Sequence, residues 1–225
     1  MPIIKRLGLV EFEPTWRAMQ QANKSRTAET PDEIWLLEHP PVFTLGLAGK
    51  PEHVLAPGEI PVMKIDRGGQ VTYHGPGQLV VYVLLDIKRL GFGVKELVKR
   101  IEQSVIDLLA EYEIESFRKS GMPGVYTNTP SPLEEGRGEG RWADHAKISA
   151  IGLRVANHAT YHGLSLNIDM DLEPFSRINP CGYEDLAVTQ MLDCGAELGN
   201  GDKMQVIGEK LIAHLSQQLY GTQHG

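Results

Sequence analysis

The sequence is poor in cysteine. Only Cys181 and Cys194 occur among the 225 residues, and they form no CxxC pair. They offer no zinc-ribbon spacing, and the eight histidines form neither an HExxH motif nor a cluster with the cysteines. We therefore expect no metal site. A single disulfide between the two cysteines is possible in principle, but a cytosolic setting would disfavour it.

Long hydrophobic runs and a positive charge balance are also lacking. No stretch approaches the roughly 20 apolar residues that a membrane span needs. The start, MPIIKRLGLVEFEP, is no secretory signal, because Glu11 and Glu13 soon interrupt a short apolar run. We therefore expect a cytoplasmic protein without membrane contact. The net charge of −7 argues against nucleic-acid binding.

The composition is that of an ordinary globular protein, with 41% hydrophobic and 23% charged residues. A length of 225 residues is enough for one sizeable domain. No internal repeat or second domain boundary interrupts it. We therefore expect a single domain over residues 1–225, acting as a monomer.

Helical spacing of apolar residues occurs in two long segments. One covers residues 94–112, and the other runs from Met204 to Leu219 after an Asn200-Gly201-Asp202 start signal. A weaker helix pattern surrounds Trp16 and Met19. The apolar residues of these helices are Val94, Leu97, Val98, Ile101, Val105, Leu108, Leu109 and Tyr112 in the first, and Met204, Ile207, Leu211, Leu215 and Leu219 in the second.

Strand-like runs lie between these helices. LVVYVLLDI, from Leu79 to Ile87, is almost continuously apolar and predicts a central strand covered on both faces. EIWLLEH, VYT near Val125, ISAIGLRV and LSLNI are further candidates. The pattern predicts an α+β fold, a mixed β-sheet flanked by helices. Residues 127–143, rich in Pro, Gly and Glu, predict a flexible loop.

Three segments carry unusual chemistry. RGGQVTYHGPGQ, from Arg67 to Gln78, holds four glycines and one proline in twelve residues, so its backbone can approach a ligand closely. It lacks the GxxxxGK[ST] spacing of a phosphate loop. A tight structural loop and a binding loop are both compatible with it, and its polar side chains favour binding slightly.

The other two segments hold candidate catalytic residues. In AKISAIGLRV, Lys147 precedes a strand with buried residues; such a lysine is usually exposed, but burial beside a pocket would lower its pKa and let it act as a base. In the segment from His162 to Leu186, Cys181 lies between Pro180 and Gly182, in a predicted turn. Most free cysteines are inert and buried, as we expect for Cys194, but this turn can present a sulfur to a cleft.

Together, RGGQVTYHGPGQ, KISAIGLRV, HGLSLN and INPCGY resemble the signature of the lipoyl(octanoyl) transferases, relatives of the lipoate and biotin protein ligases. The resemblance extends from EIWLLEHPPVFTLG to INPCGYEDLAVTQM. It implies the α+β fold of the biotin and lipoate ligases, which is class II synthetase-like. The segment before Lys147 is longer than the short turn expected in the family.

The resemblance also implies a reaction. Octanoyl would pass from octanoyl-acyl carrier protein to a lysine of a lipoyl domain, the first step of endogenous protein lipoylation. Cys181 would form a thioester acyl-enzyme, and Lys147 would accept and return the proton. The implied substrate-binding residues are Arg67, Gly68, Gly69, Gln70, Val71, Thr72, Tyr73, His74, Ala150, Ile151, Gly152, Gly163, Leu164 and Ser165.

The implied partners are proteins. Phosphopantetheine of acyl carrier protein would deliver the acyl group, so neither ATP nor a metal is expected as a cofactor. The implied acceptors are the lipoyl domains of 2-oxoacid dehydrogenase complexes and the glycine-cleavage H protein. Two alternatives stay open: an ATP-dependent lipoate or biotin protein ligase, which would need no cysteine, and a catalytically silent acyl-binding module, in which Cys181 would be replaceable.

Overall fold

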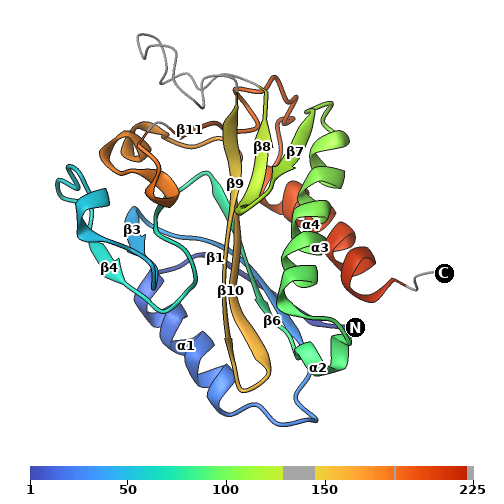
Figure 1. Cartoon of the computed structure of the whole chain (residues 1–225). Coiled ribbons are helices and arrows are strands. Elements are labelled where there is room, and N and C mark those ends of the chain that lie inside the picture. Colours follow the sequence, from blue (N-terminus) through green and yellow to red (C-terminus); the bar gives the residue numbers. More distant parts are fainter. Residues whose placement is uncertain (129–144, 185, 222–225) are drawn as a thin grey trace.

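An eight-stranded mixed sheet forms the centre of the protein (Figure 1). The structure is a computed structural model that describes residues 1–128, 145–184 and 186–221. The strand order is β1-β2-β6-β10-β9-β8-β7, and β11 pairs with β9 beside this path. The strands are β1 (Ile3–Leu9), β2 (Glu33–Glu38), β6 (Gln78–Leu84), β7 (Ser116–Lys119), β8 (Met122–Thr127), β9 (Ala146–Ala156), β10 (Ala159–Asn167) and β11 (Ala187–Val188).

The predicted mixed character of the sheet is confirmed. β1 pairs with β2 and β11 with β9 in parallel, whereas the other neighbours are antiparallel. The five strands expected from EIWLLEH, LVVYVLLDI, VYT, ISAIGLRV and LSLNI correspond to β2, β6, β8, β9 and β10. The central strand ends at Leu84, three residues earlier than predicted, because Asp86 accepts the backbone N–H groups of Lys88 and Arg89 and starts α2 (Ile87–Leu90).

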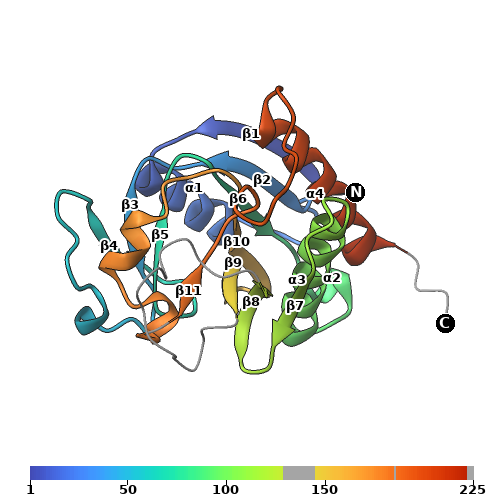
Figure 2. The same cartoon turned by 90° about the horizontal axis from the view of Figure 1, so that it is seen from above.

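Helices cover both faces of the main sheet. α3 (Val94–Ala110) and α4 (Lys203–Tyr220) lie on one face, and α1 (Phe12–Lys24) lies on the other (Figure 2). β6 shows why both faces are apolar: Leu79, Val81 and Val83 join the core under α3 and α4, while Val80 and Tyr82 join the core under α1. All three predicted helices are confirmed, and Asp202 caps α4 by accepting the Gln205 N–H.

A second, three-stranded sheet was not predicted from the sequence. It contains β4 (Val62–Lys64), β3 (Val42–Leu45) and β5 (Val71–His74) in that order. Its apolar cluster includes Phe43, Tyr73 and Phe175, so it packs against the 3₁₀ turns η3 (Glu173–Arg177) and η4 (Pro180–Gly182). Another 3₁₀ turn, η1 (Pro51–His53), lies between β3 and β4. This packing brings the glycine-rich segment close to Cys181.

The predicted loop at residues 127–143 is described only at its start. Thr127 is the last residue of β8 and is buried, so it belongs to the sheet. Residues 129–144 lie outside the described residues, and the loop there stays a prediction. Among the helices of the described part, none is long and apolar enough to cross a bilayer.

Two histidines are buried near the junction of the two sheets. His39 Nδ1 lies 2.7 Å from the Val10 carbonyl oxygen, and its Nε2 lies 2.7 Å from the Tyr82 hydroxyl, which suits a neutral ring with its proton on Nδ1. Burial lowers the pKa of His39 to about 4. Burial, together with the neighbouring His39, lowers the pKa of His74 to about 3.

These histidines predict loss of stability in mild acid. Their neutral rings stabilise the fold fully above the unfolded-state pKa of about 6.5, and the contribution is lost as the pH falls toward the folded pKa. For His39 this is about 2 kcal/mol at pH about 5. We expect the midpoint of urea unfolding to drop between pH 7.5 and 5, and His39→Gln to reduce that drop. The exposed His158→Gln variant should keep it; equal midpoints at both pH values would contradict the prediction.

Candidate active site

Cys181 is held in a strained turn that presents its side chain. It lies in η4 with φ 58°, a left-handed conformation that non-glycine residues rarely adopt. The Gly182 N–H donates to the Asn179 carbonyl oxygen at 2.9 Å, and the Tyr183 N–H donates to the Pro180 carbonyl oxygen at 3.1 Å. The half-buried Cys181 thiol is not part of a disulfide. The turn predicted from Pro-Cys-Gly is therefore present.

Lys147 meets this sulfur from the main sheet. Its Nζ lies 2.9 Å from Cys181 Sγ and 3.1 Å from the Pro123 carbonyl oxygen, and it stands 5.1 Å from the centre of the Tyr126 ring. The side chain is almost fully buried. Parallel pairing of β11 with β9, in which Val188 is the partner of Lys147, ties the segment after Cys181 to the strand that carries the lysine.

The charge state of Lys147 differs from the sequence-based expectation. Burial lowers its pKa, but the negative charge of the Cys181 sulfur and the Tyr126 side chain raise it, and the net pKa is above the ordinary lysine value. The expected lowered pKa is therefore wrong in direction. The 2.9 Å contact between the two groups favours an ammonium–thiolate pair.

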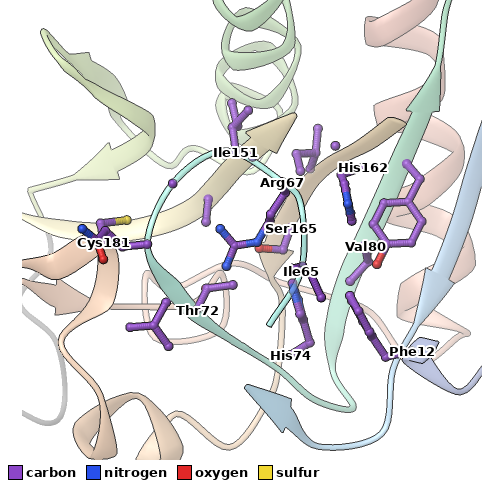
Figure 3. Close-up of a pocket in the computed structure, with 18 residues that line it drawn as sticks. Phe12, Ile65, Arg67, Thr72, His74, Val80, Ile151, His162, Ser165 and Cys181 are labelled. Atoms are coloured by element: carbon purple, nitrogen blue, oxygen red, sulfur yellow. The ribbon is translucent and has the colours of Figure 1, made fainter. Parts of the chain in front are cut away.

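An apolar pocket begins at Cys181. Figure 3 shows Cys181 at one end and Phe12, Val80 and His162 at the opposite end, with Arg67 between them. From the predicted set, twelve residues line it: Arg67, Gly69, Gln70, Val71, Thr72, His74, Ala150, Ile151, Gly152, Gly163, Leu164 and Ser165. The structure thus brings together residues from β5, β9, β10 and η4 that are far apart in the sequence.

Two predicted residues do not line this pocket. The Gly68 N–H donates to the Leu153 carbonyl oxygen at 2.9 Å and fixes the glycine-rich segment to β9. The Tyr73 ring packs against Phe43 and Phe175 in the small-sheet core. Both residues therefore hold the pocket wall in position from behind it.

The Arg67 side chain occupies space that would be closed if glycines around the pocket carried side chains. Its buried guanidinium donates to the Thr44 carbonyl oxygen at 2.7 Å, to Thr44 Oγ1 at 3.0 Å and to the Gly68 carbonyl oxygen at 2.9 Å. A Cβ on Gly46 would lie 2.9 Å from Arg67 Nη1, and one on Gly152 would lie 3.0 Å from Arg67 Cδ. The glycines leave the space that this side chain fills.

The sequence interpretation missed five pocket residues. They are Phe12, Ile65, Val80, Tyr82 and His162. Val80 and Tyr82 alternate along the predicted central strand, so their shared face could have been found from strand periodicity. His162 stands directly before the predicted Gly163; its Nε2 lies 3.1 Å from Asp66 Oδ1, and Asp66 also accepts from Trp16, Gln20 and Tyr161.

A smaller cavity adjoins Cys181 on the Lys147 side. Thr72, Ala150, Ser165 and Cys181 line both cavities, and Lys147 lines only the smaller one. Cys181 therefore stands between the apolar pocket on one side and the Lys147 ammonium group on the other. Cys194 is elsewhere, with its sulfur 3.8 Å from Thr189 Oγ1. Within the described ranges, no three His, Cys, Asp or Glu side chains gather as metal ligands would.

A family model and curated relatives each match most of the chain. The model of the lipoyl protein ligase A/B catalytic domain matches residues 13–215. The octanoyltransferase of Laribacter hongkongensis is 53% identical, covering 98% of this chain and 97% of its own. That of Dechloromonas aromatica is 57% identical, covering 97% of each chain.

Solved structures show the same fold at low identity. A lipoate-protein ligase A bound with ATP has a TM-score of 0.71 and 13% identity, covering 97% of this chain and 85% of that one. The biotin protein ligase of Aquifex aeolicus in complex with biotin and ATP has a TM-score of 0.54 and 15% identity. The match covers 97% of this chain and 71% of that one. The chain belongs to the lipoyl protein ligase A/B catalytic domain family. Its sequence groups it with the acyltransferases of that family, so it is an acyltransferase.

Proposed function

We propose that Cys181 and Lys147 transfer an octanoyl group from a carrier thioester to a lysine of a lipoyl domain. The observation that carries this proposal is the 2.9 Å contact between Lys147 Nζ and Cys181 Sγ at the end of an apolar pocket. A thiolate beside an ammonium is the form of cysteine that attacks thioesters. The octanoyltransferases at 53–57% identity support octanoyl as the transferred group.

The first half-reaction loads the cysteine. The Cys181 thiolate attacks the carbonyl carbon of the carrier thioester, and the bond from that carbon to the carrier sulfur then breaks. The departing carrier sulfur takes the proton of the Lys147 ammonium, which leaves Lys147 neutral. One thioester replaces another, so this exchange is nearly balanced in free energy and needs no ATP.

The second half-reaction returns the site to its starting state. The neutral ε-amine of the acceptor lysine attacks the acyl-Cys181 carbonyl, and the carbon–sulfur bond to Cys181 breaks. The amide nitrogen loses its extra proton to neutral Lys147, which is a general base in this step. Amide, ammonium and thiolate result, so the ammonium–thiolate pair is restored after each turnover.

The proposed partners follow from this chemistry. The donor is octanoyl on the phosphopantetheine arm of acyl carrier protein, and the acceptors are lipoyl domains of 2-oxoacid dehydrogenase complexes and the glycine-cleavage H protein. The reaction uses neither ATP nor a metal as cofactor. In this proposal the chain acts as a monomer in the cytoplasm.

The two alternatives account for less of the site. An ATP-dependent ligase would have no use for a thiol 2.9 Å from a buried ammonium group, and likeness to ligase structures at 13–15% identity concerns the fold alone. A silent acyl-binding module would likewise leave the pair of Lys147 and Cys181 without a role.

The acyl-enzyme is directly testable by intact-protein mass spectrometry with octanoyl-acyl carrier protein and no ATP. We expect a gain of one octanoyl group, labile to hydroxylamine and located on Cys181 by peptide mapping. Cys181→Ser should remain unmodified, and Lys147→Ala should load at least about tenfold more slowly because the thiolate loses its ammonium partner. An equal adduct on Cys181→Ser, or loading that needs ATP and free octanoate, would overturn the proposal.

The far end of the pocket predicts chain-length preference. Val80→Ala removes two methyl groups opposite Cys181 and makes room for a longer chain. Since each buried methylene contributes about 0.8 kcal/mol, the decanoyl-to-octanoyl ratio of kcat/KM should rise up to about tenfold. Val83→Ala is the matched control, because Val83 lies on the other face of the same strand. An equal rise in both variants would show that Val80 does not limit the chain.

A further inference from the structure

Glu102 is a buried carboxylate inside helix α3 that the proposed reaction does not use. Only 6% of the residue is exposed, and carboxylates are rarely buried without partners. Its Oε1 accepts the backbone N–H of Gly124 at 3.0 Å. Its Oε2 forms an ion pair with Arg118 Nε at 3.2 Å. Its position is therefore fixed from both sides.

The peptide group between Pro123 and Gly124 lies between Glu102 and Lys147. Its N–H donates to Glu102, and its carbonyl oxygen accepts from Lys147 Nζ at 3.1 Å. Because a peptide group is planar and rigid, fixing its N–H also fixes the direction of its carbonyl oxygen. An N–H bonded to an anion also makes the carbonyl oxygen a stronger acceptor.

The local backbone departs from regular strand geometry at this peptide. Gly124 has φ +132°, and the pairing of β8 with β9 shifts register between Val125 and Tyr126. A Cβ on Gly124 would lie 2.5 Å from the Ser149 carbonyl oxygen and 3.0 Å from Lys147 Cε. Glycine is therefore required here, and the bond to Glu102 holds the unusual peptide orientation.

We propose that Glu102 is a positioning residue that holds the Lys147 ammonium toward Cys181 through the peptide group of Pro123 and Gly124. This inference rests on the proposed role of Lys147 and adds a third charge to the site. The contacts run from the Glu102 carboxylate through the peptide group to the Lys147 ammonium and then to the Cys181 thiolate. The positive charge of Lys147 therefore lies between two negative charges.

The other charges around Lys147 increase the importance of Glu102. Tyr126, on β8, lies beside Lys147. Lys119, on β7, places its Nζ 4.8 Å from the centre of the same ring. Arg118, also on β7, lies against Glu102 itself. Burial raises the pKa of Glu102, whereas the Gly124 N–H, Arg118 and Lys147 lower it, with a net rise. Burial and the neighbouring Lys147 lower the pKa of Lys119, so Glu102 supplies a negative charge where two ammonium groups lie near each other.

The test is a pH titration of the Lys147 side chain by NMR with ¹⁵N-labelled lysine, in a Cys181→Ser background. Removing the sulfur takes away its charge, so the titration of Lys147 then depends on burial, Tyr126 and Glu102. Adding Glu102→Gln keeps an oxygen that can accept the Gly124 N–H but removes the charge. We expect the Lys147 midpoint to fall by about one pH unit. An unmoved midpoint would overturn the proposal.

Two matched variants separate positioning from a purely structural role. Glu96→Gln removes a charge from the same helix at a half-buried position paired with Arg100 and should leave the midpoint unchanged. Arg118→Gln removes the ion pair but leaves the bond from Gly124 to Glu102. If Arg118→Gln lowers the midpoint as much as Glu102→Gln does, Glu102 acts only by anchoring β7, and the proposal fails.

An activity measurement completes the test in the protein with Cys181 intact. Glu102→Gln should slow acylation of Cys181 by octanoyl-acyl carrier protein about tenfold while the KM for the donor stays the same. A changed KM with an unchanged rate would contradict a positioning role. Since the NMR titration uses no substrate, failure of octanoyl transfer and failure of the Glu102 proposal give different results.

Discussion

The site depends on one contact, the approach of the Lys147 ammonium to the Cys181 sulfur at 2.9 Å. Burial alone would push the proton off the lysine, and an unpaired buried ammonium would be unfavourable. The negative charge of the Cys181 sulfur opposes the effect of burial, and the net result is a raised pKa of Lys147. Each group keeps the other charged, so a weak nucleophile and a weak acid become a matched pair inside the protein. In the proposed reaction, the ammonium form of Lys147 donates the first proton and its neutral form accepts the second.

The rest of the fold holds Lys147 and Cys181 next to each other. Lys147 is on the main sheet, whereas Cys181 follows η3, which packs on the small sheet. β11 joins the two parts, because the strand after Cys181 pairs beside Lys147. The pocket is built in the same way from both sheets, with Arg67 filling the space that glycines leave. A change in the packing of either sheet would therefore alter the distance on which the chemistry depends.

Local patterns in the sequence were sufficient for much of this arrangement. The continuous apolar run at β6, the helical spacing in α3 and the Pro-Cys-Gly turn each encode their structure over a few residues. The small sheet was missed because β4 has only three residues and its stability comes from distant partners such as Phe175. The pKa direction of Lys147 was missed for a similar reason. It depends on a sulfur 34 residues away, and a segment alone predicts burial without its compensating charge.

The most direct test of the account is the rate at which iodoacetamide alkylates Cys181 at pH about 7, in a Cys194→Ser background. Because alkylation proceeds through the thiolate, an ammonium group beside the sulfur should speed the reaction. We expect Lys147→Met to slow alkylation at least about tenfold, since the charged sulfur then loses its partner. If the two proteins are alkylated at the same rate, the lysine does not stabilise the charged sulfur, and the ammonium–thiolate pair is contradicted.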